Sequence, residues 1–380
     1  LVSEGSRRAF HLQREDGVLY SPVPAGNWRK ELPMQMLASV GHYGIPHYVL
    51  ASGDLELLRE IWPRLCAYFD LWRLGADGLV IPREGDWNWA DWGKHQDSDA
   101  MLSAWYALAL QGERDMARWL GDGERARSAG ERMETLARSF QARYWTGTDF
   151  RGSAHEGPAD DRANALAVLA GIARPEQYPD LRRVFARELH ASPYMEKYVL
   201  EALFQMGFAE DALARMRARY EPMVASELAT LWEHWDLSSG KSSYNHAWSG
   251  GPLVLLAEEV AGIAPLELGY RVYRVRPRLG ELACVQARVP TVRGTVTVRI
   301  ERERDRLRLE LDSPPGTLAR IVLPPPAEGN WTSLLARDEL LWSEQDGARS
   351  LPGARFTGWV HSSLELSVDP GSWVFEAHAR

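Results

Sequence analysis

The chain contains 380 residues, 45% of them hydrophobic and 25% charged, with 44 Lys and Arg against 52 Asp and Glu. This length and composition fit a globular protein with a large core and two domains, and they argue against a disordered or membrane protein. The net charge of −8, without a basic run that carries interleaved aromatics, argues against nucleic acid as a partner.

Residues 1–30 show little periodicity, and the stretch EDGVLYSPVPAGNW predicts a loop because it is rich in Gly and Pro. Trp28 lies in this loop, and several of the 16 tryptophans are, like it, flanked by polar residues. Indole faces stack on the C–H faces of sugars, although core packing is the default for any single Trp. Trp28 is therefore a candidate wall of a sugar pocket.

From Glu31 the spacing becomes helical. Apolar residues at i, i+3, i+4 and i+7 predict a helix over 54–73, with Asp54 as its N-cap and Pro63 as a bend or interruption. Cys66 lies on this apolar pattern and Cys284 on a later strand pattern, so we expect buried free thiols rather than a disulfide.

The stretch LVIPREGDWNWADWGKHQDSDAM then breaks the periodicity for about twenty residues, which is long for a mere connection. Such loops are usually functional, and this one carries the polar-flanked Trp87, for which sugar stacking is the alternative to core packing. The alternative is a solvated loop that caps the next helix, for which Asp97 and Asp99 are well placed. The acidic candidates in the loop are Glu84, Asp86 and Asp91.

Helical patterns continue through the next part of the chain. They fall at about 97–120, 124–144, 161–173, 179–190, 193–206, 209–223 and 249–261. With helices at 32–50 and 54–73, these short-linked segments should pair antiparallel. RANALAVLAG is apolar nearly all round, as an inner helix of a double ring would be, whereas ARMRARYE is one-sided. We therefore expect an (α/α)6-type toroid, incomplete at its N-terminus.

Two residues at the start of the helix at 193–206 have two interpretations. If this is an inner helix, Tyr194 and Glu196 face the central cavity. The alternative is a capping turn in which Glu196 forms a solvated pair with Lys197.

Beyond Ala264–Gly269 the hydrophobic period changes to two, with Pro and Gly turns every dozen or so residues. This pattern predicts an antiparallel β-sandwich. The alternating apolar positions are Val296, Val298, Ile300, Leu307, Leu309, Leu311, Leu364, Leu366 and Val368. We expect an α+β multidomain fold, with a helical catalytic domain over 1–265 and a supporting sandwich over 266–380.

One stretch concentrates ionisable and aromatic residues: Glu227–Pro252, ELATLWEHWDLSSGKSSYNHAWSGGP. Carboxylate, imidazole and indole groups on irregular segments indicate a site, and a carboxylate there can activate water for glycosidic cleavage. Burial beside indoles would raise the pKa of Glu233, so a base at this position needs His246 or another donor nearby to stay ionised.

LWEHWD followed by NHAWSGGP resembles the end of the catalytic barrel in family 78 glycoside hydrolases, the inverting α-L-rhamnosidases. The resemblance implies that Glu233 is the general base and that His246 lines the sugar pocket. Gly85-Asp86-Trp87 resembles the family's GDW motif, which implies that Asp86 and Trp87 bind the sugar, and Trp28 matches a pocket Trp. PRLGEL…VPTVRGTVTV resembles the family's C-terminal β-domain. The implied activity is inverting cleavage of terminal α-L-rhamnosyl residues from a rhamnoside substrate.

The general acid of that family belongs to a motif of the form D-x-P-x-R-x-E-R-x-G-W-x-G-D, which this sequence lacks. Three explanations compete: a fragment of a full enzyme, an inactive relative, or Asp86 or Glu84 acting as the acid. The opening residues LVSEGSRRAF do not resemble a natural start, and helices are missing at the same end. We therefore expect a fragment or a truncated relative.

Two other functions stay open: another (α/α)-barrel glycosidase or lyase, and a non-catalytic carbohydrate-binding relative. No CxxC, His cluster or calcium-ligand spacing predicts a metal or cofactor. No signal peptide and no apolar run near the ~20 residues of a membrane span is found, so no membrane partner is expected. The compartment stays open with the cytoplasm slightly favoured, as does a homo-oligomer.

Overall fold

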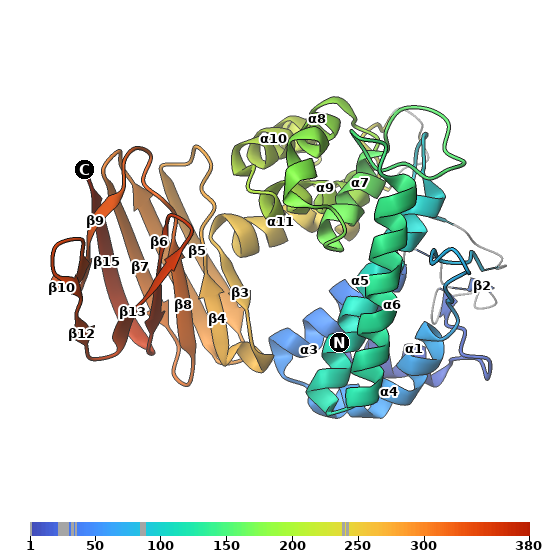
Figure 1. Cartoon of the computed structure of the whole chain (residues 1–380), viewed down its shortest axis with the longest axis horizontal. Helices are drawn as coiled ribbons and strands as arrows, with labels where there is room; N and C mark the ends of the chain where they lie inside the picture. Colours follow the sequence, from blue (N-terminus) through green and yellow to red (C-terminus); the bar gives the residue numbers. More distant parts are fainter. Residues whose placement is uncertain are drawn as a thin grey trace. The chain divides into compact units, whose positions relative to one another are not determined.

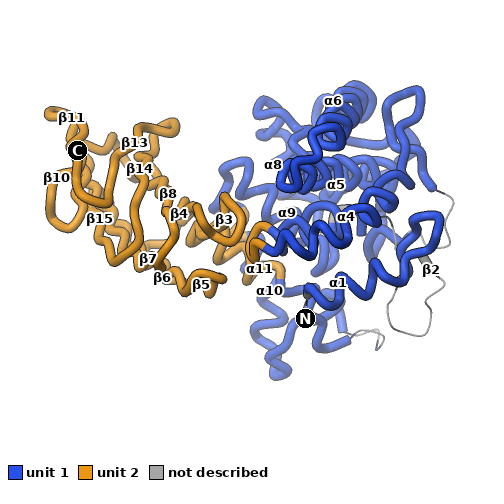
Figure 2. Tube along the Cα trace, turned by 90° about the horizontal axis from the view of Figure 1, so that it is seen from below, with its two compact units in different colours: residues 1–49, 54–211, 215–250 blue, residues 50–53, 212–214, 251–380 orange. Residues whose placement is uncertain are grey.

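A computed structural model defines the fold and describes residues 2–21, 30–31, 34, 36–83, 89–237, 240 and 243–380. The chain divides into two compact units, which Figure 2 draws in different colours. The helical unit comprises residues 1–49, 54–211 and 215–250, and the β unit comprises residues 50–53, 212–214 and 251–380. A mainly helical first part followed by β-sheets confirms the predicted α+β organisation.

The first part of the chain is a succession of helices, some joined by short turns and others by long loops such as those before α5 and α7 (Figure 1). The bounds are α1 (Val2–His11), α2 (Met36–Ala38), the π-helix η1 (Ser39–Gly44), α3 (Ile45–Ser52), α4 (Leu55–Phe69), α5 (Ser98–Leu120), α6 (Gly123–Tyr144), α7 (Asp161–Leu169), the 3-10 helix η2 (Pro175–Gln177), α8 (Tyr178–Arg187), α9 (Pro193–Gln205), α10 (Ala209–Ala225) and the 3-10 helix η3 (Ala247–Gly250). The two-residue strands β1 (Tyr20–Ser21) and β2 (Lys30–Glu31) pair antiparallel. Helix α4 continues through Pro63 without interruption.

Helix α1 was not expected, because its sequence is mostly polar and residues 1–30 were interpreted as a loop. Its Phe10 is nevertheless buried, and the Arg7 guanidinium donates to the Glu60 carboxylate on α4 at 2.7 Å. Contacts with a distant helix therefore support α1, and a local pattern could not reveal them.

The helices begin where short polar side chains can cap them. Asp54, Asp97 and Asp122 each accept a hydrogen bond from the backbone N–H three residues later. Ser192 caps α9 in the same manner, and Asp160 caps α7 by accepting the Arg162 N–H two residues later. Each cap satisfies a backbone donor that the first helical turn leaves without a partner. The predicted capping roles of Asp54 and Asp97 are confirmed.

Helices α5, α7 and α9 form the inner layer of the helical unit. Every residue of α7 is buried, which confirms the inner position predicted from RANALAVLAG. The N-terminal ends of α5 and α7 meet, since the Asp97 N–H donates to the Asp160 carboxylate at 2.8 Å. Gly121, in the left-handed conformation at φ 78°, ends α5 and lets the chain turn into the antiparallel α6.

The β unit begins with a helical segment, α11 (Gly251–Leu255) and the π-helix η4 (Leu256–Val260), which places Pro252 in the first turn as predicted. Its strands form a seven-stranded sheet, β11-β10-β9-β15-β7-β6-β5, and a six-stranded sheet, β12-β13-β14-β8-β4-β3. All pairs are antiparallel except β4 with β8. The bounds are β3 (Ile263–Pro265), β4 (Val272–Val275), β5 (Cys284–Thr291), β6 (Gly294–Arg302), β7 (Arg306–Ser313), β8 (Leu318–Leu323), β9 (Trp331–Ala336), β10 (Glu339–Ser343), β11 (Gly347–Ala348), β12 (Ser350–Leu351), β13 (Ala354–Val360), β14 (Ser363–Val368) and β15 (Gly371–Ala379), with the 3-10 helix η5 (Leu268–Tyr270) after β3.

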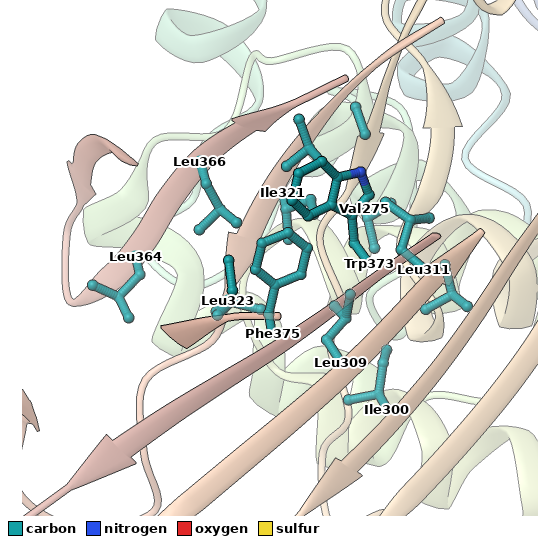
Figure 3. Close-up of a cluster of buried hydrophobic side chains, with 14 of the residues drawn as sticks. Val275, Ile300, Leu309, Leu311, Ile321, Leu323, Leu364, Leu366, Trp373 and Phe375 are labelled. Atoms are coloured by element: carbon teal, nitrogen blue, oxygen red, sulfur yellow. The ribbon is translucent and has the colours of Figure 1, made fainter. Parts of the chain in front are cut away.

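The core of the β unit lies between the two sheets (Figure 3). All nine alternating positions singled out in the sequence are buried in it, among them Ile300, Leu309 and Leu366. Trp373 and Phe375 of β15 stack in the same layer with ring centroids 5.9 Å apart. The alternation of apolar residues along the strands therefore predicted correctly which side chains face the core.

Both cysteines are free, but the prediction that both are buried is wrong. Cys66 is half-buried in α4, where burial raises the pKa of its thiol to about 11. Cys284 is exposed, because it opens β5, the edge strand of the seven-stranded sheet, where both faces of the strand are partly open.

Candidate active site

Glu233 lies on a segment that pairs with the stretch carrying His246. The Glu233 N–H donates to the Ser243 carbonyl (3.0 Å), and the His246 N–H donates to the Leu231 carbonyl (2.8 Å). Two residues that the sequence singled out separately are thus brought together by backbone hydrogen bonds.

The Glu233 carboxylate is held in its ionised form. The Ser243 N–H donates to its Oε2 at 2.9 Å, and His234 Nε2 lies 3.8 Å from its Oε1. The Ser243 N–H lowers the pKa of Glu233 most strongly, and partial burial opposes it without reversing the direction. The nearby His234 and His246 imidazoles lower this pKa further. We expected His246 or another donor to keep the Glu233 carboxylate ionised, and the main donor is the backbone amide of Ser243.

Aromatic rings from separate segments gather next to Glu233. The Trp92 ring lies 5.5 Å from the His234 ring and 5.3 Å from the Trp89 ring. Trp89 stacks on Trp248 at 5.9 Å with an interplanar angle of 11°, and His246 meets Trp248 edge-on at 4.3 Å. We call these residues the aromatic cluster; with Tyr194 added, its members are Trp89, Trp92, Tyr194, His234, His246 and Trp248.

Two indole N–H groups in this region meet no acceptor within the described ranges. They belong to Trp248 and to Trp232, whose side chain is almost fully buried. A buried donor without a partner is uncommon in a folded protein.

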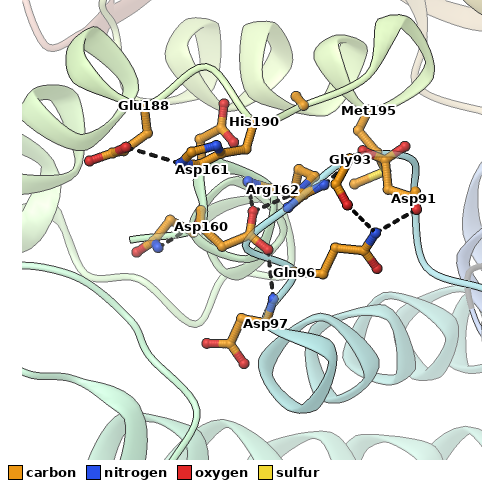
Figure 4. A network of polar contacts seen from close by, with 12 residues as sticks. Asp91, Gly93, Gln96, Asp97, Asp160, Asp161, Arg162, Glu188, His190 and Met195 are labelled. Carbon is orange, nitrogen blue, oxygen red and sulfur yellow. Dashed lines mark hydrogen bonds and ion pairs between the residues drawn. The ribbon is translucent and has the colours of Figure 1, made fainter. Parts of the chain in front are cut away.

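The loop that carries Trp89 and Trp92 is fastened by a fully buried arginine, Arg162 of α7 (Figure 4). Its Nε donates to Asp160 at 2.7 Å and its Nη1 to Asp91 at 3.2 Å. The same guanidinium donates to the backbone carbonyls of Trp92 (3.1 Å) and Lys94 (2.9 Å). The loop backbone is thus bound to the N-terminal end of an inner helix.

Asp91 also binds the next inner helix, because its Oδ2 accepts the Ser192 N–H at 3.1 Å. Its carboxylate is sealed among these partners and fully buried. The candidate acidic role for Asp91 is therefore wrong, since no sugar reaches its side chain in this arrangement. Burial raises the pKa of Asp91 to about 6, against the opposing charge of Arg162.

This raised pKa predicts a pH-dependent contribution to stability. Between the ordinary aspartate pKa of about 3.9 and about 6, the folded protein keeps a proton on Asp91 that the unfolded chain releases. The contribution is fully present below that interval and is lost as pH rises through about 6. Urea unfolding at pH 4 and pH 7 should show that Asp91→Asn removes a pH-dependent difference of about 3 kcal/mol.

An exposed aspartate, Asp305, provides the control for this experiment. Asp305→Asn should leave the pH dependence of the unfolding free energy as it is in the parent chain. Parallel curves for Asp91→Asn and the parent would contradict the prediction.

A second buried network lies at the start of α9. Arg215 of α10 donates to Glu196 at 2.6 Å and to Asp161 at 2.7 Å, and all three side chains are buried. Lys197 instead pairs with Glu201 at 2.8 Å. Glu196 is therefore neither a cavity residue nor half of a solvated pair with Lys197. It joins α9 to the outer helix α10.

Within the part of the chain that the structure describes, no group of three or more His, Cys, Asp or Glu side chains could hold a metal ion. None of the described helices has the length and apolar character of a membrane span.

A model of the bacterial α-L-rhamnosidase six-hairpin glycosidase domain matches residues 6–260. The chain belongs to this family. A model of the bacterial α-L-rhamnosidase C-terminal domain matches residues 262–333. The predicted succession of a six-hairpin helical domain and a β domain is confirmed.

Three rhamnosidase comparisons describe the extent of the match. A curated α-L-rhamnosidase of Streptomyces avermitilis is 24% identical over 299 residues, which cover 72% of this chain and 28% of that protein. The structure of an α-L-rhamnosidase from Dictyoglumus thermophilum matches with a TM-score of 0.80 at 17% identity, covering 99% of this chain and 43% of that one. The Streptomyces avermitilis α-L-rhamnosidase complexed with L-rhamnose gives 0.78 at 19% identity, covering 99% and 36%. The chain thus spans less than half the length of these rhamnosidases.

The residues assigned through the rhamnosidase motifs fall into two groups. Glu233 lies near His246, a member of the aromatic cluster, in the described structure. Trp28, Asp86 and Trp87 lie outside the described residues, as does Glu84, the other candidate acid.

Two contributors to this candidate site could not be named from motifs. The Ser243 N–H is a backbone group, so no side-chain pattern signals it. Trp92 is 39% exposed although it is a tryptophan, and its polar neighbour Asp91 was the sequence signal. Contacts across the fold, rather than local spacing, place both beside Glu233.

Proposed function

We propose that the protein carrying this chain is a glycoside hydrolase that removes terminal α-L-rhamnosyl residues with inversion at the anomeric carbon. The observation that carries this proposal is the environment of Glu233, a carboxylate with a lowered pKa beside a cluster of indole and imidazole rings. Membership of the bacterial α-L-rhamnosidase six-hairpin family supplies the sugar class.

In the proposed mechanism Glu233 acts as the general base. Its ionised carboxylate takes a proton from a water molecule as the water oxygen bonds to the anomeric carbon. On the opposite face an acid protonates the leaving oxygen as the glycosidic bond breaks. The lowered pKa of Glu233 keeps the base form populated, whereas an acid in this role would need a raised pKa.

The acid is not assigned to the carboxyl groups described around the aromatic cluster. Asp91 and Glu196 are both closed into ion pairs with buried arginines. An inverting enzyme needs the acid about 6.5–9.5 Å from the base, with room for water between them.

The remaining sugar contacts are proposed on two grounds. His246 acts on the Glu233 carboxylate and meets Trp248 edge-on, and these two rings are proposed to border the sugar. Trp28, Asp86 and Trp87 keep the sugar-binding roles that the motif resemblance implies.

A panel of p-nitrophenyl glycosides tests this function. We expect release of nitrophenol from the α-L-rhamnoside alone, with β-L-rhamnose as the first product in a proton NMR time course. Hydrolysis with retention, or a preference for another glycoside, would contradict the proposal. Binding of L-rhamnose without hydrolysis of any glycoside would instead support a non-catalytic carbohydrate-binding protein.

A further inference from the structure

The backbone that carries Glu233 is irregular, with neither helix nor strand over residues 226–237. Two backbone hydrogen bonds support it, from the Glu233 N–H to the Ser243 carbonyl and from the His246 N–H to the Leu231 carbonyl. A catalytic group has to keep its place to within about 0.5 Å. Further anchoring of this segment therefore has to come from side chains.

Trp235, two residues after Glu233, is bound through its N–H, one ring face and its edge. Its Nε1 donates to the Ala191 carbonyl at 2.7 Å, and the Arg219 guanidinium of α10 donates to the same carbonyl at 2.6 Å. The Arg219 guanidinium also lies over the indole, 4.2 Å from the ring centroid, where a cation and an aromatic face attract each other. The Tyr220 ring of α10 meets the indole edge-on at 5.0 Å. The indole thus joins the irregular segment to α10 and to the turn before α9.

The turn that accepts the Trp235 indole N–H also binds the loop of the aromatic cluster. The next residue along this turn, Ser192, donates its N–H to Asp91 at 3.1 Å. Arg162 binds both Asp91 and the Trp92 carbonyl. The segment that bears the base and the loop that bears Trp92 are therefore fastened to one turn, which fixes their relative positions.

A second anchor lies on the other side of Glu233. The Ser249 hydroxyl donates to the carbonyl of Trp232, the residue that precedes the base. Ser249 belongs to the 3-10 helix η3 and is fully buried, and its N–H donates to the His246 carbonyl at 3.2 Å. Glu233 thus lies between two side-chain anchors, one at residue 232 and one at residue 235.

The contacts of Trp235 differ from those of a tryptophan that stacks on a sugar. The Arg219 guanidinium covers one face of the Trp235 indole, and the indole N–H is already bound to a backbone carbonyl. Trp92, by contrast, is 39% exposed. These contacts favour a role for Trp235 in holding the backbone.

We propose that Trp235 and Ser249 are positioning residues, which hold the Glu233 carboxylate in place by binding the backbone on both sides of it. The proposal rests on the proposed function, because it requires Glu233 to act as the base. Neither residue needs to touch the sugar. A small displacement of a catalytic group can reduce the rate severely, so loss of either anchor should slow the chemical step more than it weakens substrate binding.

The test measures initial rates on p-nitrophenyl α-L-rhamnoside for Trp235→Phe and Ser249→Ala, each in the parent chain and in Glu233→Gln. In the parent chain each change should lower kcat about tenfold and leave KM within about twofold. In Glu233→Gln each change should alter kcat by less than about twofold, because the base that the anchors position is already absent. A general structural role would lower kcat by the same factor in both backgrounds, and a thermal melt of each variant shows whether the fold is retained.

Trp62→Phe provides the matched control, because the Trp62 indole N–H of α4 donates to the Asp122 carboxylate at 3.1 Å in the same helical unit. It should leave kcat unchanged in both backgrounds. The kcat of the parent chain in either anchor variant, an equal loss in both backgrounds, or a raised KM at unchanged kcat would overturn the positioning role alone. A parent chain that hydrolyses no α-L-rhamnoside would remove the proposed function and the positioning role with it.

Discussion

Replacing Glu233 with Gln is expected to lower kcat/KM on p-nitrophenyl α-L-rhamnoside by about 10²- to 10⁴-fold, the usual contribution of a positioned general base. An amide cannot take the proton from the attacking water. Its carbonyl oxygen can still accept the Ser243 N–H that binds the Glu233 carboxylate at 2.9 Å, so the local fold should persist. Initial-rate kinetics together with a thermal melt separate loss of catalysis from loss of structure.

Glu227→Gln is the control for this variant, because Glu227 is an exposed glutamate on the same segment. It should retain the activity of the parent chain. Undiminished turnover by Glu233→Gln would refute the assignment of the base.

The pH profile gives a second readout of the same group. The Ser243 N–H lowers the pKa of Glu233. The midpoint pH of the acidic limb of kcat/KM should therefore lie below the ordinary glutamate pKa of about 4.3. Protonation would remove the base only at more acidic pH. A midpoint above the ordinary glutamate pKa would show that another group, or a different environment of Glu233, controls the reaction.

Replacing Arg162 with Met is expected to lower the free energy of unfolding by about 3–5 kcal/mol, measured by urea unfolding at pH 7. Arg162 is fully buried, and its loss leaves the buried carboxylates of Asp91 and Asp160 without their cation. The backbone carbonyls of Trp92 and Lys94 also lose the guanidinium donor that binds this loop. Binding of L-rhamnose should therefore weaken along with stability.

Two further variants make this prediction specific. Arg138 forms an exposed pair with Glu134 at 3.9 Å, so Arg138→Met should change the free energy of unfolding by about 0.5 kcal/mol or less. Adding Asp91→Asn to Arg162→Met should recover part of the loss, because one uncompensated charge is removed. A loss below about 1 kcal/mol for Arg162→Met, or no recovery, would show that the network is not what stabilises this region.

Local rules were sufficient for much of the fold. Asp54 and Asp97 cap their helices because an aspartate before an apolar helical run can satisfy the first free N–H groups. Leu309 and Leu366 were placed in the core because alternate residues of a strand face the same side of its sheet. These properties depend on neighbours within a few positions.

Local rules failed where distant residues decide the environment. Helix α1 depends on contacts with α4, and the exposure of Cys284 depends on β5 being an edge strand. Glu196 and its neighbour Lys197 form an obvious pair in the sequence, yet Glu196 binds Arg215 from another helix. A sequence pattern carries no information on which helix lies opposite.

The sequence by itself therefore determined the helical and β parts of the chain, the membership of the rhamnosidase family and the choice of Glu233 and His246. Only the tertiary structure decided the ionisation of Glu233, because its strongest influence is the backbone amide of Ser243 on a paired segment. It also decided that Asp91 is a sealed partner of Arg162, and that Trp92 is exposed beside His234. Burial and electrostatic fields arise from groups that are close in space, and the chain brings those groups together only when it folds.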